Sequence, residues 1–291
     1  VTMAKAQGVE SICLPSAGNA GVSAAAYCQK AGIDCHVFLP ETIPDSFKKA
    51  TDQYGANIIL EGQTISHAAQ KMLESKEENW FDISTLKEPF RVEGKKTLGY
   101  EIAEQMNWEL PDVIIYPTGG GTGLIGMWKA FQELVQLGWL DSERLPKMVS
   151  VQSEGCAPIV KAYEEDQRFA TQYENAETIA RGIRVPSAVG DFMILDAIRE
   201  SGGVAIAVPE DQIVHRMRAS TRATGVSICP ETAACVLALD LLSQKKWLNA
   251  DQRIVVFNTG AAQKYLEAIE QPLPSIDRQQ SIDWKFIERG G

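Results

Sequence analysis

Short apolar runs alternate along most of the chain with longer segments in which apolar residues recur every three or four positions. The short runs predict strands, and the longer segments predict amphipathic helices. We expect strands at residues 11–15, 35–39, 57–60, 113–116, 148–152, 204–208 and 254–257. We expect helices at residues 20–31, 45–54, 64–76, 95–106, 123–137, 211–223 and 231–242. Residues 1–6 resemble the inside of a helix, and residues 166–190 predict a long loop.

The predicted strands are nearly continuous runs of Val, Ile and Leu. Such runs are typical of strands that are buried on both faces, in a parallel sheet covered by helices. The alternation of strands and helices therefore predicts an α/β protein with doubly wound parallel sheets. A polar stretch near residues 89–94 separates two series of elements. It predicts a smaller domain at residues 1–92 and a larger domain at residues 93–291, which ends in a polar tail from residue 271.

The net charge of the chain limits the classes of molecule that it is expected to bind. The 291 residues include 28 basic and 38 acidic ones, so the formal net charge is −10, and no local basic stripe stands out. This balance disfavours nucleic acid and membrane surfaces as partners, and we see no membrane-spanning run or signal peptide. The six cysteines form no CxxC pair, and the three histidines are scattered. We expect reduced, buried thiols, a cytoplasmic location and no metal site.

A glycine-rich turn from Thr118 to Gly123 links a predicted strand to a predicted helix. Its glycines allow close packing and free backbone N–H groups, and the helix N-terminus adds the positive end of its dipole. The turn therefore predicts a phosphate site, with a tight turn that binds nothing as the alternative. The same stretch contains the GxGxxG pattern of Gly121, Gly123 and Gly126, for which Glu154 is the candidate acid of a dinucleotide site.

Two other motifs also follow predicted strands. The turn SAGNAG begins at Ser16 and places Asn19 at a helix start, where Asn19 serves either as a helix cap or as a ligand contact. The turn NTG places the hydroxyl of Thr259 at the carboxyl edge of a sheet, where open α/β folds bind ligands. A helix cap is again the alternative for Thr259.

These three motifs, in this order, resemble the β-family (fold type II) of pyridoxal 5′-phosphate enzymes. The resemblance extends through SAGNAGVSAAAYCQKAGI, STLKEPFRVEGKKTLGYE, PTGGGTGLIGMWKAF and VFNTGAAQKY, from residue 1 to about residue 266. Within that family, the stretch EPFRVEGKKT makes the chain most similar to threonine synthases. The resemblance implies a two-domain fold like that of the tryptophan synthase β chain, with pyridoxal phosphate as the cofactor.

The resemblance also implies how individual residues meet the cofactor. Asn19 is expected to hydrogen-bond the 3′ oxygen of the pyridine ring, and Thr259 is expected to face the ring nitrogen. A neutral hydroxyl at that place favours a protonated ring less than a carboxylate would. The phosphate is expected to lie on the backbone N–H groups of Gly119, Gly120, Gly121, Thr122 and Gly123.

Three further residues are candidates near the substrate or the cofactor. Arg91 matches an arginine that binds the substrate phosphate in threonine synthases, and its guanidinium suits a bidentate contact. An exposed loop arginine is the alternative for Arg91. Ser16 is a candidate substrate contact. Glu231 matches a family position near the cofactor, or else it is a helix acid that interacts with the dipole.

One expected part is absent from the printed sequence. The family's Schiff-base lysine lies in an SFK-type motif upstream of the helix that residue 1 continues, and no such motif occurs in these 291 residues. We interpret Lys95 and Lys96 as ordinary helix lysines. We therefore expect an N-terminally incomplete chain that binds phosphate without the catalytic lysine. The complete protein would convert O-phospho-L-homoserine and water to L-threonine and phosphate.

Other interpretations stay open on the sequence alone. One is a related pyridoxal-phosphate-dependent serine/threonine dehydratase or β-replacement enzyme. A second, of another class, is a nicotinamide-dependent Rossmann oxidoreductase built on the GxGxxG pattern. A third is a non-catalytic homologue or subunit that starts at Val1. The expected partner is a small phosphorylated amino acid as substrate. A homodimer is one possible assembly.

Overall fold

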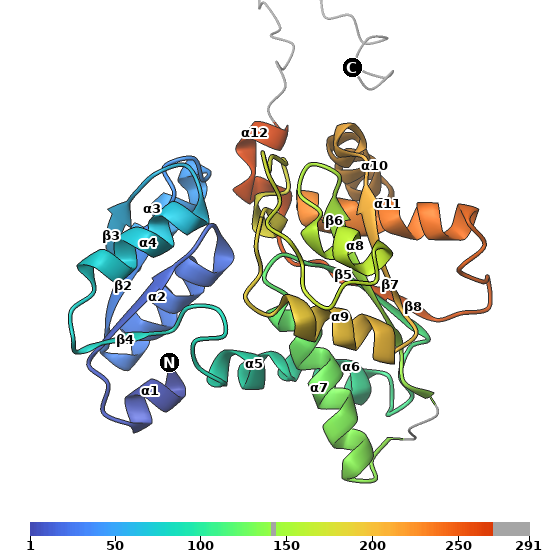
Figure 1. The fold of residues 1–291 in the computed structure, drawn as a ribbon, viewed down its shortest axis with the longest axis horizontal. Coiled ribbons are helices and arrows are strands. Elements are labelled where there is room, and N and C mark those ends of the chain that lie inside the picture. The colour runs from blue at the N-terminus through green and yellow to red at the C-terminus, as the bar shows by residue number, and fades with distance from the viewer. Residues whose placement is uncertain (141–143, 270–291) are drawn as a thin grey trace, which may run out of the picture.

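The computed structural model describes residues 1–140 and 144–269, which contain two four-stranded sheets (Figure 1). The strands are β1 (Ser11–Pro15), β2 (Asp34–Leu39), β3 (Asn57–Leu60), β4 (Trp80–Asp82), β5 (Val113–Pro117), β6 (Lys147–Ser153), β7 (Val204–Val208) and β8 (Ile254–Val256). The helices are α1 (Thr2–Ala6), α2 (Asn19–Ala31), α3 (Asp45–Gln53), α4 (Ile65–Ser75), α5 (Phe90–Lys95), α6 (Thr97–Gln105), α7 (Thr122–Gln136), α8 (Pro158–Glu164), α9 (Asp191–Glu200), α10 (Ile213–Thr224), α11 (Pro230–Gln244) and α12 (Leu266–Ile269). Short 3-10 turns are η2 (Arg181–Ile183), η3 (Glu210–Gln212) and η4 (Ala262–Lys264).

The first sheet has the strand order β3-β2-β1-β4, and its paired strands are parallel. Successive side chains of a strand point to opposite faces, so one strand contributes residues to two hydrophobic cores. Ile12 and Leu14 of β1 belong to the core that includes Phe47 of α3, whereas Cys13 packs with Met72 of α4. Helices therefore cover both faces of this sheet.

The second sheet has the strand order β7-β6-β5-β8 and is also parallel. Val113 and Ile115 of β5 belong to the core that contains the buried residues of α11. Ile114 belongs to the core on the other face, with Phe131 of α7 and Ile198 of α9. Burial on both faces explains the continuous apolar run of β5, and the predicted α/β fold with parallel, doubly wound sheets is confirmed.

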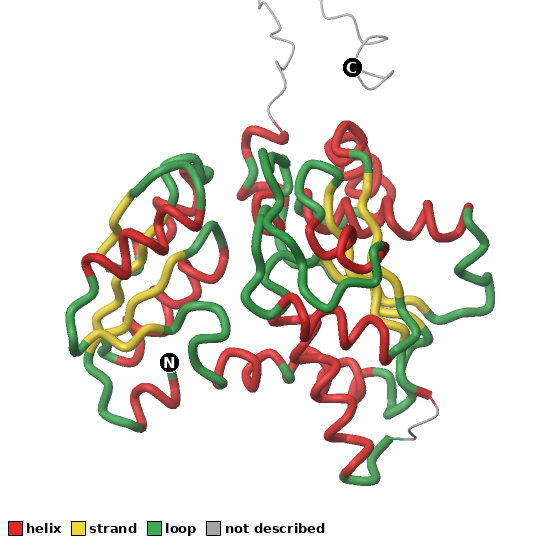
Figure 2. Tube along the Cα trace, viewed as in Figure 1, coloured by secondary structure: helices red, strands yellow, loops and turns green. Residues whose placement is uncertain are grey.

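The two sheets lie in separate lobes, as Figure 1 shows. We call residues 1–82 the small lobe and residues 90–269 the large lobe. The polar stretch near residues 89–94, where we predicted a domain boundary, forms α5, which packs on α7 of the large lobe. In Figure 2, loops line much of the space between the lobes, whereas the strands lie deeper in each lobe.

Every predicted strand lies within one residue of the bounds of an observed strand. Strands β1, β3 and β7 have the predicted bounds, and the long loop after α8 is confirmed, with η2 inside it. The predictions did not include β4, α8 or α9, and the predicted helix at 95–106 divides into the end of α5 and all of α6. The strand β4 has only three residues, which is too short for a periodic pattern that would predict a strand. The predicted polar tail lies outside the described residues.

The cysteines agree with the predicted reduced state. All six are buried and have free thiols. Among the described residues, none of the helices combines the length and the apolar character needed to span a membrane.

Candidate active site

A cavity of about 870 Å³ lies between the lobes and receives residues from both sheets. Its lining includes Pro15 at the end of β1, Asp82 at the end of β4, Pro117 at the end of β5 and Phe257 just after β8. The carboxyl ends of parallel strands are the usual place for ligands in open α/β folds. The volume falls within the range of roughly 300–1,000 Å³ typical of small-molecule sites.

The glycine-rich loop after β5 is shaped by close packing. Gly121 has φ +77°, and a Cβ there would lie 2.2 Å from the Cδ1 atom of buried Ile194. A Cβ on Gly123 would lie 2.0 Å from the hydroxyl oxygen of Tyr116, and one on Gly119 would meet the backbone of η2. These three positions therefore admit only glycine, because any side chain would displace buried neighbours.

The same loop offers hydrogen-bond donors beside the cavity. Gly120 and Thr122 line the cavity directly. Within residues 1–140 and 144–269, the amides of Gly119, Gly120 and Gly121 donate no hydrogen bond, and the first-turn amides of α7 lack intrahelical partners. The 15-residue helix α7 adds the positive end of its dipole. Free amides and a helix N-terminus together suit a phosphate group.

The turn around Asn19 faces the cavity from the small lobe. Gly18 is the N-cap of α2, so the capping interpretation of Asn19 is wrong. Asn19 lines the cavity, and its Oδ1 atom accepts a hydrogen bond of 2.5 Å from Lys264 Nζ. Ser16 also lines the cavity, but its Oγ accepts hydrogen bonds from the amides of Gly18 (3.3 Å) and Gly21 (2.9 Å). The Ser16 hydroxyl therefore holds the turn.

Thr259 lies on the opposite side, in the large lobe. It lines the cavity, and its Oγ1 is 3.7 Å from Cys229 Sγ. Its amide donates to Thr232 Oγ1 at 3.2 Å, and that hydroxyl donates to Asn258 Oδ1 at 3.0 Å, so the turn is fixed to the start of α11. The next helical turn, η4, begins only at Ala262, so Thr259 caps no helix.

Basic side chains outnumber acidic ones around the cavity, although the whole chain is acidic. Arg91 lies in the first turn of α5, and its Nη1 donates to Ile83 O at 3.0 Å and to Thr85 Oγ1 at 3.3 Å. Arg91 is therefore an ordered cavity residue. The lining basic residues are Lys87, Arg91, Lys95, Arg181 and Arg184, and the lining acidic residues are Asp82 and Glu231.

Lys95 and Lys96 differ in position despite being adjacent. Lys96 Nζ pairs with Glu93 Oε2 at 2.6 Å and with Glu133 Oε2 at 2.7 Å, which fits an ordinary helix lysine. Lys95, one helical turn after Arg91, lines the cavity and makes no ion pair within the described part of the chain. Desolvation by the surrounding protein, together with the charge of Arg91, lowers the pKa of Lys95. Lys95 is thus a cavity residue, contrary to our interpretation of it.

The GxGxxG pattern has a packing role. A Cβ on Gly126 would lie 2.7 Å from Lys95 Cβ and 3.1 Å from the carbonyl oxygen of Val92, so this glycine lets α7 and α5 approach each other. Glu154 follows β6 and is exposed, and it does not belong to the cavity lining found in the described chain. These positions give no support to a dinucleotide site.

Glu231 is a buried carboxyl group at the cavity wall. It is 3% exposed, in the first turn of α11. Its Oε1 accepts hydrogen bonds from the amide of Gly182 (2.7 Å) and from the hydroxyl of Tyr265 (2.9 Å), whereas Oε2 has no partner among the described residues. Burial raises the pKa of Glu231, which favours its neutral form. The group fastens η2 and the segment after Thr259 to α11.

Sequence reasoning missed several residues of this region. Arg181 and Arg184 come from the long loop, where no hydrophobic periodicity marks a fixed position. Lys264 lies within the stretch VFNTGAAQKY, but only the fold shows that it reaches Asn19. The sequence does contain a pattern that could have indicated the two arginines. They flank a Gly-Ile pair in a segment whose other charged residues are mostly acidic.

Comparison with known proteins gives consistent results. The family model described as "Pyridoxal-phosphate dependent enzyme" matches residues 1–260. The chain is 35% identical to the threonine synthase of Methanocaldococcus jannaschii over 278 residues, which cover 94% of this chain and 68% of that protein. It is 30% identical to the threonine synthase of Mycobacterium tuberculosis, over 95% of this chain and 74% of that protein.

Solved structures share the fold at lower identity. Maize serine racemase superposes with a TM-score of 0.72 at 20% identity, covering 98% of this chain and 79% of that one. Threonine deaminase isoform 2 from Solanum lycopersicum gives a TM-score of 0.71 at 20% identity, covering 89% and 72%. These likenesses confirm the expected fold type II architecture, and at this level of identity they bear on the fold alone.

Proposed function

Because this chain belongs to the family of pyridoxal-phosphate-dependent enzymes, we propose that the complete protein carries out the threonine synthase reaction. In that reaction O-phospho-L-homoserine and water give L-threonine and phosphate. The observation that carries the proposal is the group of basic side chains around the cavity of an acidic protein. The cofactor phosphate and a substrate phosphate are both anionic, so a cavity that binds both would need locally positive charge in this negatively charged protein.

The cavity residues fit the cofactor. We assign its phosphate to the free amides of the loop from Gly119 to Gly123. We assign its ring oxygen to Asn19 and its ring nitrogen to Thr259, which line the cavity from opposite lobes. When bound, pyridoxal phosphate supplies an electron sink that stabilises negative charge on the carbons of an amino acid. A hydroxyl beside the ring nitrogen moderates that electron withdrawal, because it leaves the ring less positively charged than a carboxylate would.

The substrate phosphate is assigned to Arg91 and Lys95. Both line the cavity, one helical turn apart on α5. Arg91 is held by Ile83 and Thr85, so its guanidinium is pre-oriented for a bidentate contact. A dianion between these two cations would relieve their mutual repulsion. Such a pair favours a phosphorylated amino acid over an unphosphorylated one.

The test compares substrates with the holoenzyme. O-phospho-L-homoserine is expected to yield threonine and phosphate in equal amounts, whereas L-serine and L-threonine are expected to yield no keto acid at a comparable rate. Threonine is measured by chromatography, phosphate by a colorimetric assay, and keto acid through its reduction. Keto acid from L-threonine or L-serine, without threonine from the phosphorylated substrate, would contradict the proposal and favour a dehydratase.

Replacing Lys95 with glutamine is expected to raise the KM for O-phospho-L-homoserine about tenfold, with a smaller effect on kcat. The variant loses one charge-assisted contact but keeps the polarity and much of the length of the side chain. Because the pKa of Lys95 is lowered, the wild-type KM should also rise with pH at a lower pH than an unperturbed lysine would predict. Initial rates across a pH series measure both effects.

The adjacent variant Lys96→Gln is the matched control. It removes the same charge from a residue whose partners are Glu93 and Glu133. We expect a loss of thermal stability without the change in KM. Equal KM values for the Lys95→Gln variant and the wild type would show that Lys95 does not contact the substrate phosphate.

A further inference from the structure

Lys264 connects the end of the large lobe to the small lobe. It lies at the end of η4, and its Nζ donates a hydrogen bond of 2.5 Å to Asn19 Oδ1. Its carbonyl oxygen accepts a hydrogen bond of 2.5 Å from Ser46 Oγ, and its Nζ lies 5.7 Å from the centroid of the Phe47 ring. Backbone and side chain of Lys264 are therefore both anchored on the small lobe.

The hydrogen bond to Lys264 fixes the orientation of the Asn19 amide. An ammonium group has donors and no acceptor, so only the carboxamide oxygen of Asn19 can face it. The Nδ2 group must then point elsewhere. It lies near Gly260, because a Cβ on that glycine would be 3.6 Å from Asn19 Nδ2. With its oxygen held by Lys264, Asn19 turns its N–H donors away from the lysine. Without that contact the carboxamide could rotate and present either its oxygen or its N–H group there.

We propose that Lys264 is a positioning residue that holds the Asn19 amide with its N–H groups toward the ring oxygen of pyridoxal phosphate. The inference rests on the assignment of Asn19 to that oxygen under the proposed function. Lys264 is not among the residues that line the cavity in the described chain, whereas Asn19 is. Lys264 therefore acts through Asn19, and its charge strengthens the N–H donors by polarising the amide.

The contact also explains why an asparagine serves here. The ring oxygen of pyridoxal phosphate is an acceptor with anionic character, and it is best matched by N–H donors. A carboxylate at position 19 would pair with Lys264 but would offer no donor to the cavity. A residue without a side-chain oxygen would leave the ammonium of Lys264 without this acceptor. A carboxamide accepts from the lysine through its oxygen and donates to the cavity through its nitrogen, so two separate atoms serve the two partners.

The test uses the holoenzyme without substrate. We expect Lys264→Met to weaken pyridoxal phosphate binding about tenfold and to shift the visible absorption band of the bound cofactor, since one charge-assisted hydrogen bond is lost. Lys264→Arg, which keeps the charge and the donors, should restore most of both properties. Fluorescence titration gives the affinity, and absorption spectroscopy gives the band.

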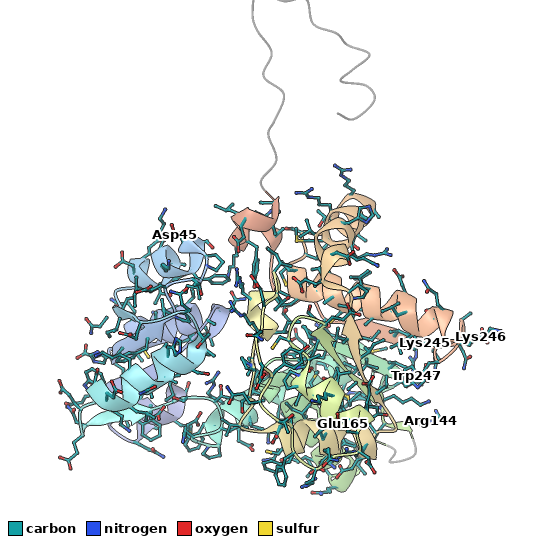
Figure 3. The ribbon with its side chains drawn as sticks, turned by 45° about the horizontal axis from the view of Figure 1, so that its top comes forward. Asp45, Arg144, Glu165, Lys245, Lys246 and Trp247 are labelled. Carbon is teal, nitrogen blue, oxygen red and sulfur yellow. The ribbon has the colours of Figure 1, made fainter. Side chains whose placement is uncertain are left out.

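Two comparisons separate positioning from a general loss of structure. Lys245→Met removes a lysine at the exposed end of α11, on the outer surface in Figure 3, and should change neither the affinity nor the band. Asn19→Ala should shift the band by itself, and adding Lys264→Met to it should cause no further shift, because the lysine acts through Asn19. If the methionine variant melts before assay temperature, Lys264→Gln replaces it.

The outcomes are distinct. A normal band in Lys264→Met, or additive effects in the double variant, overturns the role of Lys264. A normal band in Asn19→Ala overturns the assignment of Asn19, and with it this proposal. Because no substrate is present, these results do not depend on which reaction the enzyme catalyses. Failure of the threonine synthase assignment is detected separately, by the substrate comparison.

Discussion

Replacing Gly120 with aspartate is expected to weaken pyridoxal phosphate binding by at least about 100-fold. Gly120 lines the cavity, and its backbone does not need the left-handed region. A Cβ there would meet only Thr85, at 3.4 Å from its Cγ2 atom, so a side chain fits with little displacement. The carboxylate would lie beside the free amides of the loop, where it would occupy the anion site and repel the phosphate.

The matched control is Gly120→Asn, which has nearly the same size without the charge. We expect it to lose much less affinity than the aspartate variant, and titration of both variants with pyridoxal phosphate measures the difference. Gly121→Asp is also expected to abolish binding, but mainly by strain at φ +77° and by collision with Ile194, and a lowered melting temperature should accompany it. Similar affinities for the two Gly120 variants would mean that the loop does not bind the phosphate.

Replacing Arg91 with alanine is expected to lower kcat/KM for O-phospho-L-homoserine by about 100-fold or more, with pyridoxal phosphate affinity unchanged. The guanidinium lines the cavity but lies on α5, whereas the assigned cofactor contacts come from the loop after β5, the turn at Asn19 and the turn at Thr259. Its loss should therefore affect the substrate alone. Steady-state kinetics and a cofactor titration on the same preparation provide the measurement.

Arg91 also donates to Ile83 and Thr85, so a structural loss has to be separated from a lost substrate contact. Arg91→Lys keeps a charge in the cavity and should recover part of kcat/KM, although it lacks the bidentate fork. Arg222→Ala, at an exposed position on α10, should behave as the wild type. Unchanged binding of O-phospho-L-homoserine and of inorganic phosphate by Arg91→Ala would exclude Arg91 as the phosphate contact.

The sequence predicted the parts of the fold that local physics determines. The apolar runs of β1, β5 and β7 are buried on both faces, so strand position and parallel pairing follow from composition. The glycine loop was predictable because its run of glycines stands out between a strand and a helix. The structure shows why glycine is needed there: Gly121 has a positive φ, and Gly123 lies against Tyr116. The three-residue β4 and the seven-residue α8 were missed because they are short, and α9 was missed although its buried Ile194, Leu195 and Ile198 recur at helical spacing.

The candidate site was only partly predictable. The resemblance singled out Asn19, Thr259 and Arg91, and all three line one cavity. It could not indicate that Lys95 shares the cavity with Arg91, because the predicted helix began at residue 95, whereas the observed α5 contains both residues four positions apart on one face. The net negative charge of the chain also gave no indication of the basic cavity lining, because the basic residues that line the cavity come from segments far apart in the chain.

The contact between Asn19 and Lys264 joins residues that lie 245 positions apart, so its two sides are synthesised at different times. The small lobe is synthesised before the large lobe, and its local βα units can fold while the large lobe is made. The Asn19 amide, however, has no fixed orientation until Lys264 has been added, and Glu231 has no hydroxyl partner until Tyr265 follows. The segment around Lys264 and Tyr265 thus fixes two cavity side chains only after both lobes have been made, so the contact between Lys264 and Asn19 cannot template the folding of the small lobe.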